Sequence, residues 1–415
     1  MIYAFTSCAL NYTPKSKALL RSLREHAPDI KVCLALADDI REFEGELLEQ
    51  FDHIYSLADI EGLMDKSWVF GHNIVELCTA IKPFVLRKLL DREDCEAVFY
   101  FDPDMVLFSD INEMIKDVRE NDILLTPHLT DPETTIRGIE DNELSALKHG
   151  TYNLGYVGVR NCDEGKRFAK WWSDRLKNYC REDIPAGIFT DQKWIDLVPG
   201  FFDNVKILRH NGYNVASWNL TNRNVTRLKN GTYKVNDVPL VFYHFTGFDS
   251  GSHVLMANRY SANNSNVKDL VMWYTDTTAE LAKHKMAQVP WAYANYDDGT
   301  PIMAEERIIY RQRADLKITF PNPFLASAKN DRTFKSWWQT TGKAEHSVKE
   351  SSPPSLVEIT KPKKYIKSTR PFFWQLPSKL YKFCVQPVFR KNVINLINDT
   401  YRYWGLKGVI KLFIR

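Results

Sequence analysis

The chain has 415 residues, of which 44% are hydrophobic and 13% aromatic, so it can bury a large core and is too apolar to be a disordered protein. Its net charge of +3 hides an asymmetry. Residues 361–415 contain 13 Lys or Arg and one acid, a segment charge of +12, which leaves −9 on the preceding 360 residues. Charge segregated in this way is typical of a tail that contacts an anionic partner.

Seven cysteines are scattered along the chain without Cys-x-x-Cys spacing, which argues against a zinc cluster or a disulfide framework. Most lie in apolar runs, so we expect buried free thiols in a reducing compartment. The sequence shows no charged leader followed by an apolar region, and no run approaches the roughly 18 apolar residues that span a bilayer. These features predict a cytoplasmic protein.

The first hundred residues predict alternating strands and helices. Short apolar runs predict strands at 2–6, 30–37, 53–55 and 97–102, and apolar residues at helical spacing predict helices at 14–26, 42–51 and 77–90. Alternation of this kind is typical of a mostly parallel sheet covered by helices, in which ligands bind beyond the carboxyl ends of the strands. We therefore predict an α/β fold with a mixed, mostly parallel sheet.

The later part of the chain is less regular. Its patterns predict strands at 151–159, 205–208 and 240–243, helices at 163–179, 267–283 and 304–313, an acidic connecting region at 131–142 and a hairpin around Asn230-Gly231. We expect four segments in chain order: a main domain at 1–250, a helical extension packed on it at 251–340, a flexible linker at 341–370 and a basic aromatic tail at 371–415.

Two carboxylates stand at the end of the most apolar strand. Asp102 and Asp104 follow the run from Ala97 to Phe101, and a second apolar run starts at Met105. An unpaired buried charge is costly, and a divalent cation with hard oxygen ligands, Mg²⁺ or Mn²⁺, would neutralise both acids. The alternative is a strand end at which both acids face solvent. An Asp-x-Asp triplet alone does not decide between them.

Several ordered motifs in residues 1–250 support the metal site. They are Thr6-Ser7-Cys8 with Asn11-Tyr12, Thr79-Ala80-Ile81-Lys82-Pro83, Asp102-Pro103-Asp104, Tyr152-Asn153-Leu154-Gly155, Asp191-Gln192, Trp218-Asn219 and His244-Phe245-Thr246-Gly247. Together they resemble the motifs of GT-A-fold glycosyltransferases, most closely the retaining family 8 enzymes of bacterial polysaccharide assembly. The resemblance implies a Rossmann-like GT-A fold and a nucleotide-sugar donor whose diphosphate is bridged by Mn²⁺ or Mg²⁺ to the Asp-x-Asp acids.

The same resemblance implies the third metal ligand and the phosphate contact. His244 follows an apolar strand and precedes Gly247, as in the family's His-x-x-Gly motif; the alternative is a core histidine bonded to a backbone carbonyl. The family's Lys-Pro-Trp after that glycine is missing here, where the chain reads Phe248-Asp249-Ser250. Lys82 is therefore the expected phosphate cation, unless it is a solvated lysine on a helix surface.

Further donor contacts follow from the resemblance. Asp191 and Gln192 are expected to contact the donor sugar near the reacting face, although Asp191 could also cap the next helix. Asn153 and Gly155 resemble the family's Asn-Ala-Gly turn, where glycine allows the backbone to approach the sugar. For the uridine end the plausible contacts are Thr6, Tyr12 and Asp39, and stacking on Tyr12 is one of the expected interactions.

The resulting hypothesis is a metal-dependent glycosyltransferase of the hexosyltransferase type. It would move a sugar from a UDP-sugar to a glycan or glycolipid acceptor in bacterial surface polysaccharide synthesis, with retention inferred from the family alone. A sugar-nucleotide nucleotidyltransferase is disfavoured because residues 6–11 contain no glycine for a phosphate loop. A catalytically inactive sugar-binding scaffold is disfavoured because the acids and His244 are intact.

The basic aromatic tail leaves three interpretations. Lys and Arg interleaved with Trp and Phe suit an anionic membrane surface, where they would dock the protein peripherally at the inner face of the plasma membrane. An accessory packed subdomain is the second interpretation. Nucleic-acid binding is the third, and we do not expect it as a partner.

Overall fold

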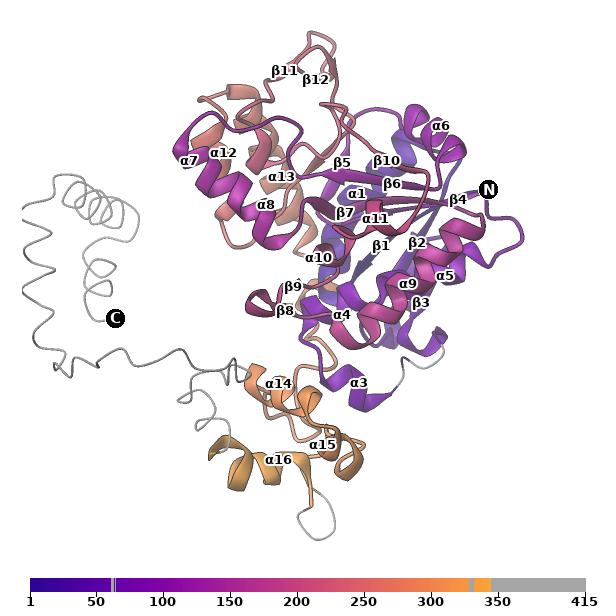
Figure 1. Cartoon of the computed structure of the whole chain (residues 1–415), viewed down its shortest axis with the longest axis vertical. Helices are drawn as coiled ribbons and strands as arrows, with labels where there is room; N and C mark the ends of the chain where they lie inside the picture. Colours follow the sequence, from indigo (N-terminus) through magenta and orange to yellow (C-terminus); the bar gives the residue numbers. More distant parts are fainter. Residues whose placement is uncertain (61–62, 64, 328–331, 345–415) are drawn as a thin grey trace, which may run out of the picture. The chain divides into compact units, whose positions relative to one another are not determined.

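The computed structural model describes residues 1–60, 63, 65–327 and 332–344, all within one compact unit, Met1–Ser351. Its centre is a seven-stranded sheet in the order β10-β6-β7-β4-β1-β2-β3 (Figure 1). The strands are β1 (Ile2–Cys8), β2 (Lys31–Leu36), β3 (His53–Ser56), β4 (Ala97–Phe101), β6 (Ile123–Pro127), β7 (Tyr152–Arg160) and β10 (Val205–Ile207). Only β7 runs antiparallel to its neighbours, β4 and β6. This confirms the predicted mixed, mostly parallel sheet.

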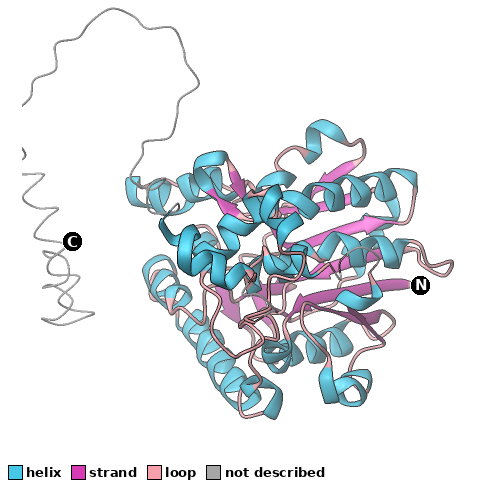
Figure 2. Cartoon of the chain, turned by 90° about the horizontal axis from the view of Figure 1, so that it is seen from below, coloured by secondary structure: helices cyan, strands magenta, loops and turns pink. Residues whose placement is uncertain are grey.

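The sheet is buried on both faces, because successive side chains of each strand point to opposite sides. In β1, Tyr3 and Phe5 pack with α5 (Lys82–Leu90) and α9 (Asp163–Tyr179), whereas Ile2 and Ala4 pack with α1 (Thr13–His26) and α6 (Asn112–Glu120). Figure 2 shows helices on both sides of the strands. The continuous apolar runs that identified these strands reflect this two-sided burial.

Two smaller β structures follow the sheet. β5 (Met105–Leu107) pairs antiparallel with β14 (Phe242–His244), and this two-stranded ribbon lies directly after the Asp-x-Asp turn. β11 (Val225–Arg227) and β12 (Tyr233–Val235) form the hairpin that Asn230-Gly231 predicts, with β13 (Val238–Pro239) added to it. A two-residue pair, β8 (Glu182–Asp183) and β9 (Ile188–Phe189), precedes the Asp191-Gln192 motif.

The remaining helices surround the sheet and build the extension. Near the sheet are α2 (Glu44–Leu48), α3 (Lys66–Phe70), α4 (Ile74–Ala80), α7 (Ile136–Gly138), a π-helix (Ile139–Glu143), α8 (Leu144–His149), α10 (Gln192–Ile195) and α11 (Val198–Phe201). The extension contains α12 (Ser252–Tyr260), α13 (Ser265–Leu281), α14 (Ala304–Gln312), α15 (Ala314–Thr319), α16 (Phe334–Trp337) and a π-helix (Trp338–Gly342). None of the helices in the described ranges is long and apolar enough to span a bilayer.

The extension is fixed to the α3–α4 region by two arginines of α14, of which Arg307 is buried. Arg307 donates to the carbonyls of Phe70 and His72, both at 3.0 Å, and to that of Tyr293. Arg311 pairs with Glu76 of α4 at 2.8 Å. We call Glu76, Arg307 and Arg311 the extension clamp, since they join α14 to the segment just before α5.

Several local predictions were wrong. The helix predicted at 77–90 is two helices, α4 and α5, because Pro83 cannot donate an N–H and starts a new helix instead. The region 131–142 is not a plain connecting loop, since α7 and a π-helix form there. The predicted helix at 42–51 shortens to α2, preceded by a 3₁₀ turn.

The segment boundaries have mixed outcomes. The π-helix Trp338–Gly342 includes the first two residues of the predicted linker at 341–370. The linker beyond position 344 and the whole tail at 371–415 lie outside the described residues. The boundary at residue 250 stays a prediction. All six described cysteines are free thiols, four of them buried, as expected from their apolar surroundings.

Candidate active site

A cleft of about 850 Å³ opens at the carboxyl ends of the parallel strands. Ser7 and Cys8 at the end of β1 line it, as do Asp102 and Asp104 after β4. Because β7 is antiparallel, its first residues lie at the same edge, so Asn153 also lines the cleft. The fold therefore places motifs from distant parts of the sequence in one cleft.

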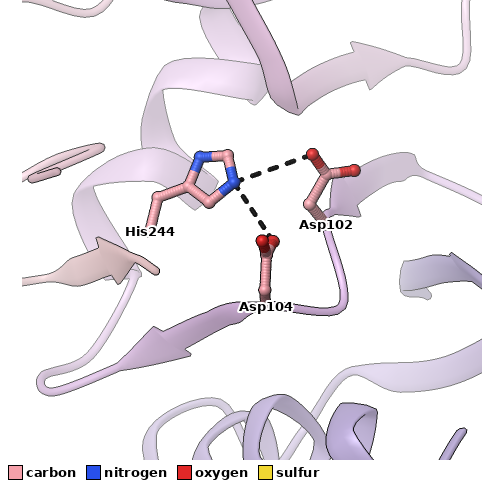
Figure 3. A group of neighbouring side chains, drawn as sticks. All are labelled: Asp102, Asp104 and His244. Atoms are coloured by element: carbon pink, nitrogen blue, oxygen red, sulfur yellow. Dashed lines mark ion pairs between the residues drawn. The ribbon is translucent and has the colours of Figure 1, made fainter. Parts of the chain in front are cut away.

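Asp102, Asp104 and His244 meet because of how β4 ends. The Asp102 N–H donates to the Gly155 carbonyl at 2.7 Å, which extends the β4–β7 pairing by one residue. The chain then turns into β5, whose register with β14 sets His244 opposite Met105, and the Phe245 N–H donates to the Asp104 carbonyl at 2.9 Å. Figure 3 shows the imidazole directed at both carboxylates.

The three side chains form a group of metal-ligand type. His244 Nε2 lies 3.1 Å from Asp104 Oδ1 and 3.8 Å from Asp102 Oδ2. One ligand atom from each residue lies within 4.8 Å of the others. The His244 side chain is 3% exposed, and those of Asp104 and Asp102 are 18% and 26% exposed, so the oxygens remain accessible from the cleft.

The acids and the imidazole shift each other's protonation. Burial lowers the pKa of His244, but the adjacent Asp104 carboxylate outweighs burial and raises the pKa above its ordinary value. Burial conversely raises the pKa of Asp104, and the charge and hydrogen bond of His244 outweigh it, so the net shift is downward. A bound divalent cation would replace the proton on His244 Nε2 as the partner of these carboxylates.

The donor set fits a divalent cation. Two carboxylates and one imidazole are hard or borderline ligands, which suit Mn²⁺ or Mg²⁺. Asp102, Asp104 and the nearby Asp191 supply three negative charges when ionised, against one positive charge on Lys82. The two uncompensated charges equal those of a divalent ion.

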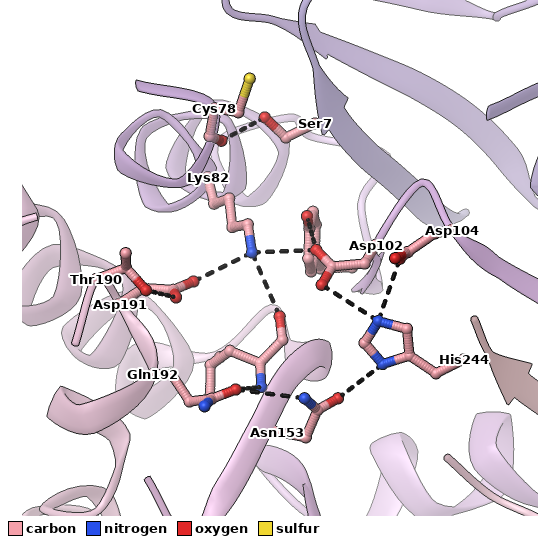
Figure 4. A network of polar contacts seen from close by, with 12 residues as sticks. Ser7, Cys78, Lys82, Asp102, Asp104, Asn153, Thr190, Asp191, Gln192 and His244 are labelled. Atoms are coloured by element: carbon pink, nitrogen blue, oxygen red, sulfur yellow. Dashed lines mark hydrogen bonds and ion pairs between the residues drawn. The ribbon is translucent and has the colours of Figure 1, made fainter. Parts of the chain in front are cut away.

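Lys82 is a buried lysine at the start of α5, only 5% exposed. Its Nζ lies 3.2 Å from Asp102 Oδ1 and 3.2 Å from Asp191 Oδ2 (Figure 4). It also lies 4.3 Å from the centre of the Tyr100 ring. Burial lowers the pKa of Lys82, but the two carboxylates outweigh it and raise the pKa, so the amine stays charged. The alternative of a solvated surface lysine is wrong.

Asp191 is buried and aimed at Lys82 rather than at the helix behind it. It stands at the N-terminus of α10, where its side chain accepts no capping hydrogen bond. Burial raises the pKa of Asp191, and the Lys82 ammonium offsets that rise only in part. The capping interpretation is therefore wrong, and the carboxylate belongs to the cleft, where it lines the wall beside Gln192.

Two glycines allow this close packing. A Cβ on Gly155 would lie 2.6 Å from His244 Cε1 and 2.8 Å from Asn153 Oδ1, distances that real side chains do not tolerate. Gly247 has φ +69°, a left-handed backbone in which a side chain is strained, and a Cβ there would collide with Ser252 Oγ. Gly155 thus allows the His244 ring to approach β7, and Gly247 turns the chain along the cleft wall.

The residues predicted for the uridine end are not all at the cleft. Tyr12 lines it, half-buried, with its ring 4.8 Å from Lys15 Nζ. Thr6 is buried inside β1, and its neighbour Ser7 lines the cleft instead. Asp39 is exposed and does not line the cleft. The roles of these three residues stay predictions.

Sequence reasoning assigned no role to two residues of the site. Tyr100 is buried below Lys82 and donates its hydroxyl to Asp102. Trp218 donates Nε1–H to the His128 carbonyl at 3.0 Å and packs edge-to-face against His244, with ring centres 5.5 Å apart. The only sequence signal for Tyr100 was its place two residues before Asp102, on the same face of β4.

Among curated proteins, two from Bacillus subtilis strain 168 are similar to this chain. YfnD, an uncharacterized protein, is 27% identical over 244 residues, which covers 56% of this chain and 74% of YfnD. YfnF, also uncharacterized, is 25% identical over 288 residues, which covers 68% of this chain and 93% of YfnF. No protein-family model matches the chain.

Among solved structures, the chain is similar to the glycosyltransferase GlyE of Streptococcus pneumoniae TIGR4, at 17% identity and a TM-score of 0.35, over 52% of this chain and 46% of GlyE. It is also similar to the galactosyltransferase LgtC in complex with donor and acceptor sugar analogs, at 15% identity and a TM-score of 0.34, over 63% of this chain and 96% of LgtC. The aligned part thus spans about half of GlyE. At these values the chemistry has to be argued from the side chains themselves.

Proposed function

We propose that the protein is a divalent-metal-dependent glycosyltransferase that uses a nucleotide-sugar donor. The observation that carries the proposal is the convergence of Asp102, Asp104 and His244 at the floor of the cleft, with one ligand atom from each within 4.8 Å. The cleft volume of about 850 Å³ suits a ligand of nucleotide-sugar size, because small-molecule sites typically measure about 300–1,000 Å³.

The finer assignment draws on the ordered motifs. Their resemblance to GT-A-fold enzymes, and most closely to the retaining family 8, supports a UDP-sugar donor, hexosyl transfer with retention, and a place in bacterial surface polysaccharide synthesis. Mn²⁺ is the preferred metal of the proposal, because an imidazole ligand suits manganese better than magnesium. The acceptor is a glycan or a glycolipid.

The cleft residues would have different roles in such a transfer. When bound, the cation would stabilise the negative charge that develops on the leaving diphosphate. Asp102, Asp104 and His244 would hold it, and Lys82 keeps Asp102 in place while adding a positive charge to this end of the cleft. Asp191 and Gln192 also line the cleft, where they would contact the donor sugar.

The tail at 371–415 lies outside the described residues, and its docking to an anionic membrane is part of the proposal only on its composition. A lipid-linked acceptor would make such docking useful. Binding of the full-length chain to vesicles with and without anionic lipid tests this part separately. Equal binding to both kinds of vesicle would argue against it.

Hydrolysis of a panel of nucleotide-sugars, with Mn²⁺ or with a chelator, tests the function. We expect slow release of one sugar from a UDP-sugar in the presence of Mn²⁺, and loss of that activity in Asp104→Ala. Asp29→Ala is the matched control, because Asp29 is an exposed acid outside the cleft. Activity that survives the chelator would refute the metal assignment, and inactivity toward every nucleotide-sugar would refute the transferase.

A further inference from the structure

We propose that Asn153 and Gln192 are positioning residues whose hydrogen-bond polarity keeps a proton on His244 Nδ1 and thereby assigns Nε2 as the nitrogen that binds the cation. The inference deepens the proposed function and rests on its metal site. It concerns two residues that the motif resemblance places at the donor sugar. Figure 4 shows the chain of contacts from Gln192 through Asn153 to His244.

The orientation of the Gln192 amide is set by two backbone groups, one that only accepts and one that only donates a hydrogen bond. Gln192 Nε2 lies 3.1 Å from the His149 carbonyl, which only accepts, and Gln192 Oε1 lies 3.3 Å from the Leu154 N–H, which only donates. A flipped Gln192 amide would face both backbone groups with the wrong atom. The position of the Gln192 oxygen is therefore determined by the main chain.

The Asn153 amide is fixed from two directions. Its Nδ2 lies 3.3 Å from Gln192 Oε1, an acceptor. The same Nδ2 lies 3.3 Å from His128 Nε2, while His128 Nδ1 lies 3.3 Å from the Thr151 carbonyl. Because a carbonyl only accepts, Nδ1 of a neutral His128 carries the proton in this contact and Nε2 accepts. Both neighbours thus require the NH₂ group of Asn153.

His244 takes the remaining atom of this amide. Asn153 Oδ1 lies 3.2 Å from His244 Nδ1, and an amide oxygen only accepts, so Nδ1 must carry a proton. The lone pair available for a metal is then on Nε2, the nitrogen that faces Asp104 and Asp102. A histidine whose second nitrogen donates to a fixed acceptor is the usual arrangement around protein-bound metals.

Two glycines let the backbone approach the Gln192 and Asn153 side chains closely. A Cβ on Gly150, whose φ is +130°, would lie 2.9 Å from Gln192 Cγ. A Cβ on Gly155 would lie 2.8 Å from Asn153 Oδ1. The amide groups therefore fill the space next to these glycines, and reversal of Asn153 would set its oxygen against two acceptors, Gln192 Oε1 and His128 Nε2.

Nitrogen NMR of protein labelled with ¹⁵N-histidine tests the proton position without activity. On addition of diamagnetic Cd²⁺, which replaces any proton on Nε2, we expect a shift of the Nε2 resonance with a directly bonded proton still on His244 Nδ1. His253 is an internal reference, because its Nδ1 lies 3.1 Å from the Thr246 carbonyl in the same way. A proton absent from His244 Nδ1, or Cd²⁺ bound at Nδ1, would overturn the inference.

Substitutions at Asn153 separate positioning from packing. Asn153→Asp keeps an acceptor toward His244, although its second oxygen faces Gln192 Oε1 and His128 Nε2, and it is expected to bind Mn²⁺ more tightly than Asn153→Leu. Asn153→Leu keeps the volume but removes the acceptor, and is expected to weaken Mn²⁺ binding by about 10- to 100-fold, the usual effect of losing such a partner. Equal affinity of both variants, at unchanged unfolding temperatures, contradicts the inference.

Gln192→Met tests the next contact and does not depend on the stability of the Asn153 variants. It fills the same space without an amide, so Asn153 loses one of its two fixed neighbours, and we expect weaker Mn²⁺ binding than in the unmodified protein but stronger than in Asn153→Leu. The outcomes separate the two proposals. If the unmodified protein binds no divalent cation, the proposed function fails; if it binds Mn²⁺ and all variants match it, only this inference fails.

Discussion

The protein buries positive charge in two regions for different reasons. In the extension clamp, Arg307 is 4% exposed and bonds to three backbone carbonyls of the fold itself. In the cleft, Lys82 is almost equally buried, but its main partners are the carboxylates of Asp102 and Asp191, which line an open cavity.

The comparison shows how to separate a structural cation from a functional one. The partners of Arg307 are backbone carbonyls of segments that the fold brings together at this point, so the arginine has a structural role. Of the acids around Lys82, Asp102 is 26% exposed and remains accessible from the cleft, and together Asp102, Asp104 and Asp191 carry more charge when ionised than the lysine. Burial alone therefore does not indicate function, whereas buried charge left over at the wall of a cavity does.

The largest effect is expected from the extension clamp. Arg307→Met leaves three carbonyls without a partner, and each buried group left unsatisfied costs about 1–3 kcal/mol, so we expect a loss of about 4 kcal/mol in the free energy of unfolding. Urea unfolding followed by circular dichroism measures it. A loss below about 1 kcal/mol would mean that the extension is not held by this arginine.

Lys82→Met is expected to cost about 3 kcal/mol in the metal-free protein at pH 8, because it leaves two carboxylates without their cation. Saturating Mn²⁺ stabilises every variant whose metal site is intact, but only for Lys82→Met should it narrow the stability difference from the unmodified protein. This contrast in metal rescue is the sharpest test of the difference between the two regions. If Mn²⁺ leaves that stability difference unchanged, Lys82 is a structural cation like Arg307.

The same variant has a pH signature. Burial already holds the pKa of Asp191 above its ordinary value in the folded protein, and removing Lys82 raises that pKa further. The ionised carboxylate then opposes folding, so the stability lost in Lys82→Met should be small near pH 4 and grow as the pH rises above it. Unfolding curves of both proteins across pH 4–8 measure this trend, and a constant difference would contradict it.

A glycine pair gives a smaller effect on metal binding. Gly155→Ala puts a methyl group 2.6 Å from His244 Cε1, and we expect Mn²⁺ affinity to fall about tenfold as the ring is displaced. Gly45→Ala is the matched control: nothing lies within 4 Å of its added Cβ in α2, where alanine favours the helix by up to about 1 kcal/mol. Titration calorimetry with Mn²⁺ compares them, and equal affinities would mean that the ring adapts.

The smallest effect is expected from Glu76→Gln. Glutamine keeps an acceptor for the Asn73 N–H at the start of α4 but loses the charge that pairs with Arg311. We expect a loss of about 1–2 kcal/mol in stability and no change in Mn²⁺ affinity. A change in affinity would show that the clamp and the cleft are coupled through α4.

Much of the sheet was predictable, because apolar runs fix the strands. The grouping of Asp102, Asp104 and His244 was predicted from the acids at a strand end together with the family resemblance of the His-x-x-Gly motif. Asp38 and Asp39 show what a local sequence pattern does not predict. Both follow β2, yet Asp38 is buried and accepts the N–H groups of Leu10 and Ala292, while Asp39 is exposed. Which of two adjacent acids faces inward depends on a segment 254 residues away, and no local pattern records that contact.

The partners of Lys82 and the amide contacts of Asn153 could not be predicted from the sequence either. A lysine before a proline indicates the start of a helix. Only the packing of α5 against β4 directs the Lys82 amine toward Asp102. Hydrogen-bond polarity between Gln192, Asn153 and His244 depends on side chains from three separate elements. Such arrangements are tertiary, so periodicity and spacing cannot predict them.

The short ribbon of β5 and β14 has a consequence for folding. It brings together Asp104 and His244, two side chains that could hold a metal ion and that β6, β7 and β10 separate along the chain. An ion held by both would act as a reversible cross-link across that whole stretch, penalising the open chain much as a disulfide does. Protease resistance and melting temperature should therefore report ion concentration, even without any sugar present.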